Sequence, residues 1–124
     1  LCRELLKHPD ALRYTSTREQ PFRPNVPGKT IQMRTHNHLL GHVEGCDGLK
    51  TGYIAASGYS IAVTAARRGQ RAIAVVLDSI SWKVRDAKAA ELLAKGFAAL
   101  PAVGQGAAAP ASPPTAATVK GPKK

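Results

Sequence analysis

Two apolar stretches joined by a short turn constrain the fold of this chain more than any other feature. Over residues 59–65, apolar side chains alternate with smaller or polar ones, the period of two that is typical of a strand. Residues 67–70, with Gly69 among them, form a turn signal. The next stretch is almost continuously apolar over 73–77, which predicts a central strand buried on both faces. A turn this short predicts an antiparallel hairpin.

The segment after this hairpin predicts a helix. Ser79 or Ser81 suits the position that caps the start of a helix, and the helical pattern continues to about Ala99. The apolar positions recur at the spacing of one helical face and are Ala89, Ala90, Leu93 and Phe97. A helix packed across such a hairpin predicts the α+β class, an antiparallel sheet with packed helices.

Residues 1–28 predict two short helices followed by a connection. Residues 1–7 have the pattern of the last turns of a helix, and Pro9 opens a second short helix that reaches about Tyr14. The rest of this region is polar and contains three prolines. It therefore predicts a connection with one short edge strand around Phe22.

Residues 29–48 predict one more strand and a loop. Ile31 and Met33 alternate with polar residues over 29–34, which favours a half-buried strand. Residues 41–48 contain three glycines and are expected to form a loop. The informative stretch that ends in the hairpin follows directly.

The composition changes at residue 101 and divides the chain into two parts. Residues 101–124 contain seven alanines and five prolines but no acidic and no aromatic residue. Such a segment buries too little apolar surface to offset the entropy lost on ordering. We therefore predict a folded part over 1–100 and an Ala/Pro-rich, disordered, basic tail over 101–124.

The net charge of +10 favours anionic partners such as nucleic acid, acidic lipid or an acidic cell-wall polymer. The basic residues are scattered, however, and aromatic residues make up only 5% of the chain. A nucleic-acid surface more often combines a basic stripe with stacking aromatics. A solvated basic surface is therefore the favoured interpretation, and nucleic acid is not among the expected partners.

The cysteines and histidines do not predict a metal site. Cys2 and Cys46 fit the spacing of neither a zinc site nor a redox pair. Three histidines, His36, His38 and His42, lie close together in the sequence, but no carboxylate accompanies them at a ligand-like spacing. They are expected at the surface of a loop.

The triplet Lys50-Thr51-Gly52 is the strongest candidate for chemistry. Lysine supplies a positive charge and threonine a hydroxyl, and glycine leaves room for a ligand to approach the strand backbone. A strand edge at this position can pair with an extended peptide through main-chain hydrogen bonds. The triplet by itself is common, so its surroundings decide how much it means.

Those surroundings resemble the serine-type D-alanyl-D-alanine carboxypeptidases, the low-molecular-mass penicillin-binding proteins. The similar elements occur in the family's order and span about residues 1–100. They are His8-Pro9, Asn37 before Leu39-Leu40, the run 45–53 around Lys50-Thr51-Gly52, Ser57-Gly58-Tyr59, the strand 72–77, Arg85, Leu92-Leu93 and Gly96-Phe97. Cys46 and Ile54 depart slightly from the family's usual residues. The resemblance implies part of a β-lactamase/transpeptidase-like fold.

The resemblance also implies a role for each candidate residue. In the family, a serine attacks the carbonyl between the two terminal D-alanines of a peptidoglycan stem peptide, and water hydrolyses the acyl-enzyme. Lys50 would supply positive potential, and Thr51 would bind the terminal carboxylate. The backbone beyond Gly52, around Tyr53, would run beside the substrate and could supply an oxyanion-hole N–H. Arg85 would hold Thr51 or reinforce the carboxylate site.

The family's nucleophile is missing from this chain. None of the serines has a lysine three residues later, so no Ser-x-x-Lys motif is present. The Ser-x-Asn element is absent too, because the only asparagines are Asn25 and Asn37. We therefore expect the chain to be the C-terminal half of a catalytic domain, with no catalytic residue of its own, and to be inactive alone.

The expected partners follow from the resemblance. They are a stem peptide ending in D-Ala-D-Ala and, with the missing half, β-lactam antibiotics. The family uses no metal or organic cofactor, acts in the periplasm or elsewhere outside the cytoplasm, and can associate with membranes through parts not present here. Two alternatives stay open: a non-catalytic module that binds a cell-wall peptide or another protein, and a basic nucleic-acid-binding protein.

Overall fold

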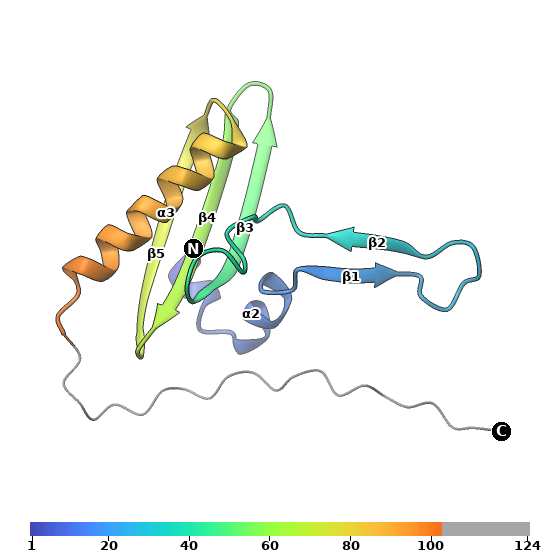
Figure 1. Ribbon diagram of the computed structural model, residues 1–124, viewed down its shortest axis with the longest axis horizontal. Helices are drawn as coiled ribbons and strands as arrows, with labels where there is room; N and C mark the ends of the chain where they lie inside the picture. Colours follow the sequence, from blue (N-terminus) through green and yellow to red (C-terminus); the bar gives the residue numbers. More distant parts are fainter. Residues whose placement is uncertain (103–124) are drawn as a thin grey trace.

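The computed structural model describes residues 1–102 (Figure 1). In chain order the elements are α1 (Cys2–Leu5), α2 (Pro9–Thr15), β1 (Glu19–Phe22), β2 (Ile31–Arg34), β3 (Cys46–Ile54), β4 (Gly58–Arg67), β5 (Gln70–Ser79) and α3 (Trp82–Ala99). The expected tail lies outside the described residues, apart from its first two.

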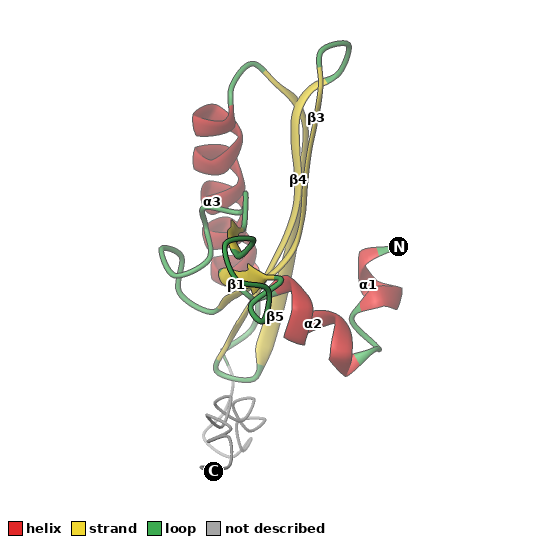
Figure 2. Ribbon diagram, turned by 90° about the vertical axis from the view of Figure 1, so that its right-hand side faces the viewer, coloured by secondary structure: helices red, strands yellow, loops and turns green. Residues whose placement is uncertain are grey.

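A three-stranded antiparallel sheet with one long helix forms the body of the molecule. The strand order is β3-β4-β5, and β4 and β5 form the expected hairpin, with Arg67 paired to Gln70 at its turn. Helix α3 lies along one face of this sheet, and α1 and α2 lie on the other side, near one end (Figure 2). The predicted α+β class, an antiparallel sheet with packed helices, is confirmed.

The core lies between α3 and the sheet. Alternate residues of β4 and β5 face the helix, and the apolar stripe of α3 meets them. The buried cluster consists of Leu39, Ile61, Val63, Ala65, Ala74, Val76, Ala89 and Leu93. Ser81 caps the helix as one of the two expected residues, because its hydroxyl accepts a hydrogen bond of 3.2 Å from the backbone N–H of Val84.

The prediction that 73–77 forms a central strand buried on both faces is wrong. β4 is the central strand, and β5 is an edge of the described sheet. Ala74 and Val76 face α3, whereas Val75 and Leu77 on the opposite face are 51% and 71% exposed. A continuous apolar run does not indicate which face of a strand is buried. In β5, only the face toward α3 is covered by another layer.

The strand predicted over 29–34 exists, but it is not half-buried. It pairs with β1, the strand expected around Phe22, in a separate two-stranded ribbon that projects from the body (Figure 1). Ile31 and Met33 are 56% and 55% exposed, because an isolated ribbon has no layer to cover either face.

The glycine-rich loop is shorter than predicted. β3 begins at Cys46, so Lys50-Thr51-Gly52 lies in the middle of a strand of its own. A turn over residues 55–57 separates β3 from β4. Gly58 closes this turn with a φ of +57°, and a Cβ there would lie 2.7 Å from the carbonyl oxygen of Ser79. That close approach requires glycine.

Among residues 1–102, no helix is both long and apolar enough to cross a bilayer.

Candidate functional site

Strand β3 forms the edge of the described sheet and carries the Lys50-Thr51-Gly52 triplet. Thr51 pairs with Ile61 and Lys50 with Ala62, so Thr51 lies on the α3 side of the sheet and Lys50 on the other. The Lys50 side chain is exposed, and its Nζ donates to the carbonyl oxygen of Thr51. A Cβ at Gly52 would meet nothing within 4 Å, so the backbone there is open to a ligand.

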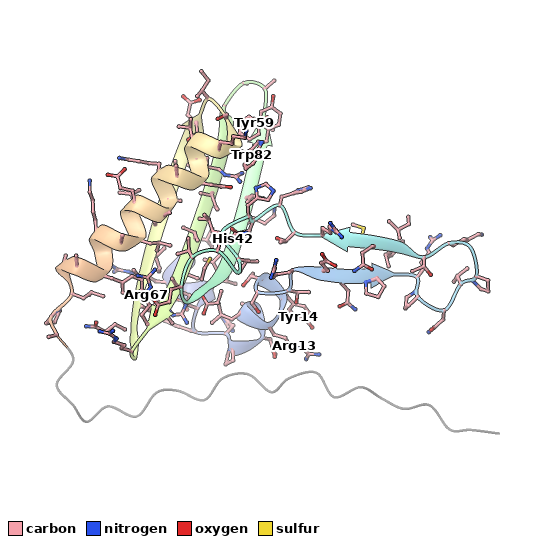
Figure 3. All side chains as sticks on the ribbon, viewed as in Figure 1. Arg13, Tyr14, His42, Tyr59, Arg67 and Trp82 are labelled. Carbon is pink, nitrogen blue, oxygen red and sulfur yellow. The ribbon has the colours of Figure 1, made fainter. Side chains whose placement is uncertain are left out.

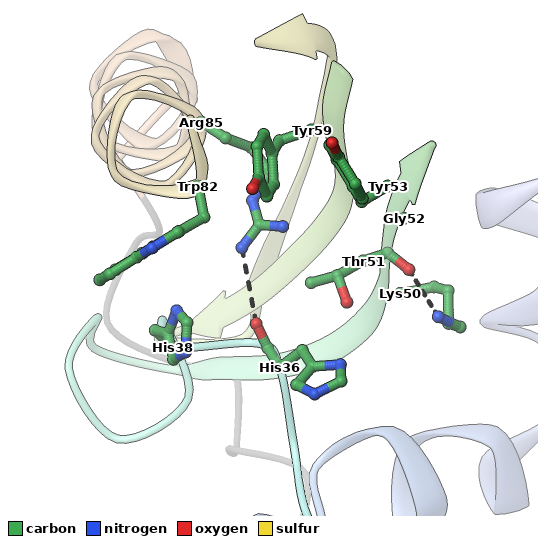
Figure 4. Close-up of a pocket in the computed structure, with 9 residues that line it drawn as sticks. All are labelled: His36, His38, Lys50, Thr51, Gly52, Tyr53, Tyr59, Trp82 and Arg85. Atoms are coloured by element: carbon green, nitrogen blue, oxygen red, sulfur yellow. Dashed lines mark hydrogen bonds between the residues drawn. The ribbon is translucent and has the colours of Figure 1, made fainter. Parts of the chain in front are cut away.

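A cavity of about 550 Å³ opens beside this edge (Figure 4). Its lining comes from β3, the start of β4, the start of α3 and the loop that precedes β3. The lining residues are His36, His38, Lys50, Thr51, Gly52, Tyr53, Tyr59, Trp82 and Arg85. The five residues singled out from the sequence, Lys50, Thr51, Gly52, Tyr53 and Arg85, therefore line one cavity although Arg85 comes from a different element.

Arg85 extends from the first turn of α3 toward β3, and it is buried, with an exposed fraction of 3% (Figure 4). Its Nε donates to Oδ1 of Asp86 at 2.7 Å, and its Nη2 lies 3.5 Å from the carbonyl oxygen of His36. The ion pair between Arg85 and Asp86 is therefore buried. The guanidinium occupies the space between α3 and Thr51 (Figure 4).

His38 and Trp82 form a second wall that the sequence did not predict. Their rings lie 4.6 Å apart between centroids at an angle of 59°. The His38 ring also meets Asp86, with Nδ1 lying 3.2 Å from Oδ2. Sequence analysis placed His38 in a surface loop and gave it no partner, because the partner lies 48 positions further along the chain.

Two tyrosines close the far end of the cavity. Tyr53 and Tyr59 face each other across the β3–β4 turn, with ring centroids 4.3 Å apart. Tyr59 and Trp82 lie together at this end of the sheet, and Arg67 lies at the other (Figure 3). The alternation over 59–65 correctly placed Tyr59 in a strand but could not indicate a role at the cavity.

Buried and partly buried polar contacts fix the loop and the strand that carry the site. Oδ1 of Asn37 accepts from the backbone N–H of Leu39 at 3.1 Å, which anchors the loop between His36 and His38. At the start of β3, Asp47 accepts two hydrogen bonds from Arg71, of 2.8 and 2.9 Å. The carboxylate of Asp47 therefore has a structural role.

Cys46 does not offer an alternative nucleophile. Burial raises the pKa of its thiol, and the nearby Asp47 carboxylate raises it further, although a hydrogen bond to Gly48 partly offsets both. A thiol with a raised pKa is protonated at neutral pH and reacts poorly. Among residues 1–102, no three His, Cys, Asp or Glu side chains gather closely enough to hold a metal ion.

Comparison with known proteins places this chain in a family. The family described as D-alanyl-D-alanine carboxypeptidase matches residues 1–81. The chain is 34% identical over 97 residues to D-alanyl-D-alanine carboxypeptidase DacF of Bacillus subtilis. This chain therefore belongs to the D-alanyl-D-alanine carboxypeptidase family, as the sequence resemblance indicated.

Solved structures of penicillin-binding proteins and transpeptidases resemble this chain as well. A penicillin-binding protein of Listeria monocytogenes, solved in its ampicillin-bound form, superposes with a TM-score of 0.62 at 34% identity, over 77% of this chain and 37% of that one. A DD-transpeptidase of Streptomyces gives a TM-score of 0.68 at 26% identity, over 75% and 37% of the two chains. These matches confirm the expected transpeptidase-like fold.

The match covers only part of these relatives. The alignment with DacF covers 78% of this chain but only 25% of the length of DacF.

Proposed function

We propose that this chain supplies the carboxylate-binding wall of a serine-type D-alanyl-D-alanine carboxypeptidase. The observation that carries the proposal is that Thr51 and Arg85, from two separate elements, meet at one cavity beside an open strand edge, which Lys50 and Gly52 also line. A guanidinium and a hydroxyl at one site suit a C-terminal carboxylate, because a charged donor makes a strong hydrogen bond to it.

The edge of β3 orients the peptide. An extended peptide that pairs with this edge places its terminal carboxylate near Thr51 and Arg85 and passes beside Gly52, where no side chain obstructs it. The backbone N–H near Tyr53 then lies next to the carbonyl to be attacked and stabilises the oxyanion that forms there. Lys50 adds positive potential on the side where the nucleophile arrives.

The nucleophile comes from polypeptide outside this sequence. A serine hydroxyl attacks the carbonyl between the two terminal D-alanines, its proton passes to a base, and the bond to the terminal D-alanine breaks as that amine leaves protonated. Water then hydrolyses the ester. Because residues 1–124 contain no Ser-x-x-Lys, the chain alone binds the peptide without cleaving it.

The setting of the activity follows from the substrate. Peptidoglycan stem peptides are its partners, and β-lactams, which carry a carboxylate and a reactive amide, acylate the same serine. The site therefore operates outside the cytoplasm, where peptidoglycan lies, and it needs no metal or organic cofactor.

A graft into DacF tests this function. The 97 aligned residues of this chain replace the matching segment of DacF, and covalent labelling by a fluorescent penicillin is followed over time. The graft is expected to label, Lys50→Gln and Thr51→Val to slow labelling about tenfold or more, and the exposed-lysine control Lys95→Gln to leave it unchanged.

The isolated chain of 124 residues is the second arm. It is expected to take no covalent label. Circular dichroism shows whether each graft folds. If the folded Lys50→Gln and Thr51→Val grafts are labelled as fast as the unchanged graft, the proposed role is refuted. Labelling of the isolated chain would refute the absence of a nucleophile.

A further inference from the structure

Asp86 links two walls of the cavity. One of its carboxylate oxygens, Oδ1, accepts from Nε of Arg85 at 2.7 Å and lies 2.7 Å from Nη2 as well. The other oxygen, Oδ2, lies 3.2 Å from Nδ1 of His38. An ionised carboxylate only accepts hydrogen bonds, so Nδ1 of His38 carries the proton in this contact.

This pairing is not a routine helix-surface contact. Neighbouring residues in a helix point about 100° apart and do not face each other. The carboxylate of Asp86 nevertheless contacts the guanidinium of Arg85, and both residues are buried, with exposed fractions of 3% and 6%. A buried arginine needs a partner for its charge, and a buried carboxylate needs its lone pairs satisfied. Each meets that requirement for the other.

The geometry leaves one side of the guanidinium available. Nε and Nη2 are directed to Asp86 and to the carbonyl oxygen of His36, whereas Nη1 makes no hydrogen bond with residues 1–102. The guanidinium lies between α3 and β3, with Thr51 across the cavity from it (Figure 4). The planar group is thus held by one edge and presents the other.

We propose that Asp86 is a positioning residue for substrate recognition: it fixes Arg85 through Oδ1 and the His38–Trp82 wall through Oδ2, so that Nη1 of Arg85 meets the C-terminal carboxylate of a D-alanyl peptide. This inference rests on the function proposed above. Without Asp86, the guanidinium is free to rotate, and the His38 ring loses its link to α3. The site then distinguishes a carboxylate from a neutral terminus less well.

The full chain and two ligands test this inference. Dissociation constants for acetyl-D-alanyl-D-alanine and for its C-terminal amide are measured by NMR on the wild type, on Asp86→Asn and on the control Glu91→Gln. Glu91 is an acid on the exposed side of the same helix. We expect the preference for the carboxylate to fall about tenfold in Asp86→Asn and to be unchanged in Glu91→Gln. Equal weakening of both ligands would mean a merely structural role and would overturn the inference.

A second measurement needs no ligand. The Arg85 Nε–H signal, assigned with Arg85→Lys, is expected to be shifted and slow to exchange with water in the wild type. In Asp86→Asn, its chemical shift should move to that of the other arginine Nε–H signals. If the wild type binds neither ligand, the proposed function fails, and the role of Asp86 is then judged from the Nε–H signal alone. An unchanged signal in Asp86→Asn overturns the inference. Loss of the shifted signal supports Asp86 as the residue that holds Arg85 in place.

A third variant covers the case in which Asp86→Asn does not fold. His38→Phe retains an aromatic ring against Trp82 but removes the contact to Oδ2. We expect it to lower the preference for the carboxylate by a smaller factor, about threefold. His42→Phe, in the same loop but outside this cavity, is the matched control. Identical preferences in His38→Phe and His42→Phe would contradict the role of Oδ2.

Discussion

Asp47 and Arg71 form a two-point ion pair that bridges the two outer strands of the sheet. Nη1 and Nη2 of Arg71, on β5, lie 2.8 and 2.9 Å from the two carboxylate oxygens of Asp47, on β3. Nη1 also donates to the hydroxyl of Thr64 on β4, the strand between them, at 2.9 Å. This pair ties together all three strands next to the register shift that precedes Gly48.

Asp47→Asn is expected to destabilise the chain. The substitution removes the charge that compensates Arg71 in a partly buried position, and we expect the free energy of unfolding to fall by about 1.5 to 3 kcal/mol. Urea denaturation of the full chain measures it. The exposed pair of Glu4 and Lys7 supplies the control: Glu4→Gln should change the free energy of unfolding by less than about 0.5 kcal/mol. Equal effects would argue against the bridge.

Leu93→Ala tests the α3 core. Leu93 is fully buried against the sheet, so its truncation leaves a cavity and should cost about 2 to 5 kcal/mol of unfolding free energy. Leu77→Ala makes the same chemical change at an exposed position of β5 and should cost far less. Thermal or urea unfolding compares the two. A larger loss from Leu77→Ala would mean that the exposed face of β5 is covered in solution.

Gly52→Ala separates folding from binding. A Cβ at this position would meet nothing within 4 Å, so we expect the free energy of unfolding to change by less than about 0.5 kcal/mol. The methyl group would stand beside the strand edge, and penicillin labelling of the DacF graft should slow. Gly45→Ala is the contrast, because φ is +74° and a Cβ there would overlap the carbonyl oxygen of Ala66. It should lose stability, and normal labelling by a well-folded Gly52→Ala graft would contradict the proposed approach of the peptide.

The raised pKa of Cys46 predicts a pH dependence. The folded thiol ionises at a higher pH than the unfolded one, so its contribution to stability is present below the ordinary pKa of 9.0 and is lost as pH rises through the folded pKa. In a Cys2→Ser background, alkylation of Cys46 by iodoacetamide, followed by mass spectrometry, should be slow near neutral pH and should accelerate only above pH 9. Rapid alkylation at neutral pH would contradict the effect of burial.

Local signals in the sequence were sufficient for the hairpin and the long helix. Residues 67–70 form the turn between β4 and β5, and Ser81 begins α3, because each depends on short-range chemistry. The burial of Val75 and Leu77 was predicted wrongly, since exposure depends on which layers exist, and composition does not reveal them. The turn at 55–57 was missed, although Ser57-Gly58 at its end is a dipeptide typical of turns.

The site shows the same division. Lys50, Thr51 and Gly52 were found because they are consecutive and lie in a run that resembles a family, and Arg85 was found through that resemblance. His38, Tyr59 and Trp82 were missed as lining residues because three different elements bring them to the cavity. Asp86 was not singled out, since its contact with His38 exists only in the folded chain.

The cap at Ser81 has a consequence for recognition far from its own hydrogen bond. It sets the residue at which α3 begins, and therefore the direction in which every later side chain leaves the helix axis. One residue inserted between Ser81 and Arg85 would swing the arginine by about 100°, away from β3. The hydroxyl of Ser81 thus sets the rotational position of the side chains on α3. That position determines whether the Arg85 guanidinium and the Thr51 hydroxyl on β3 face the same ligand.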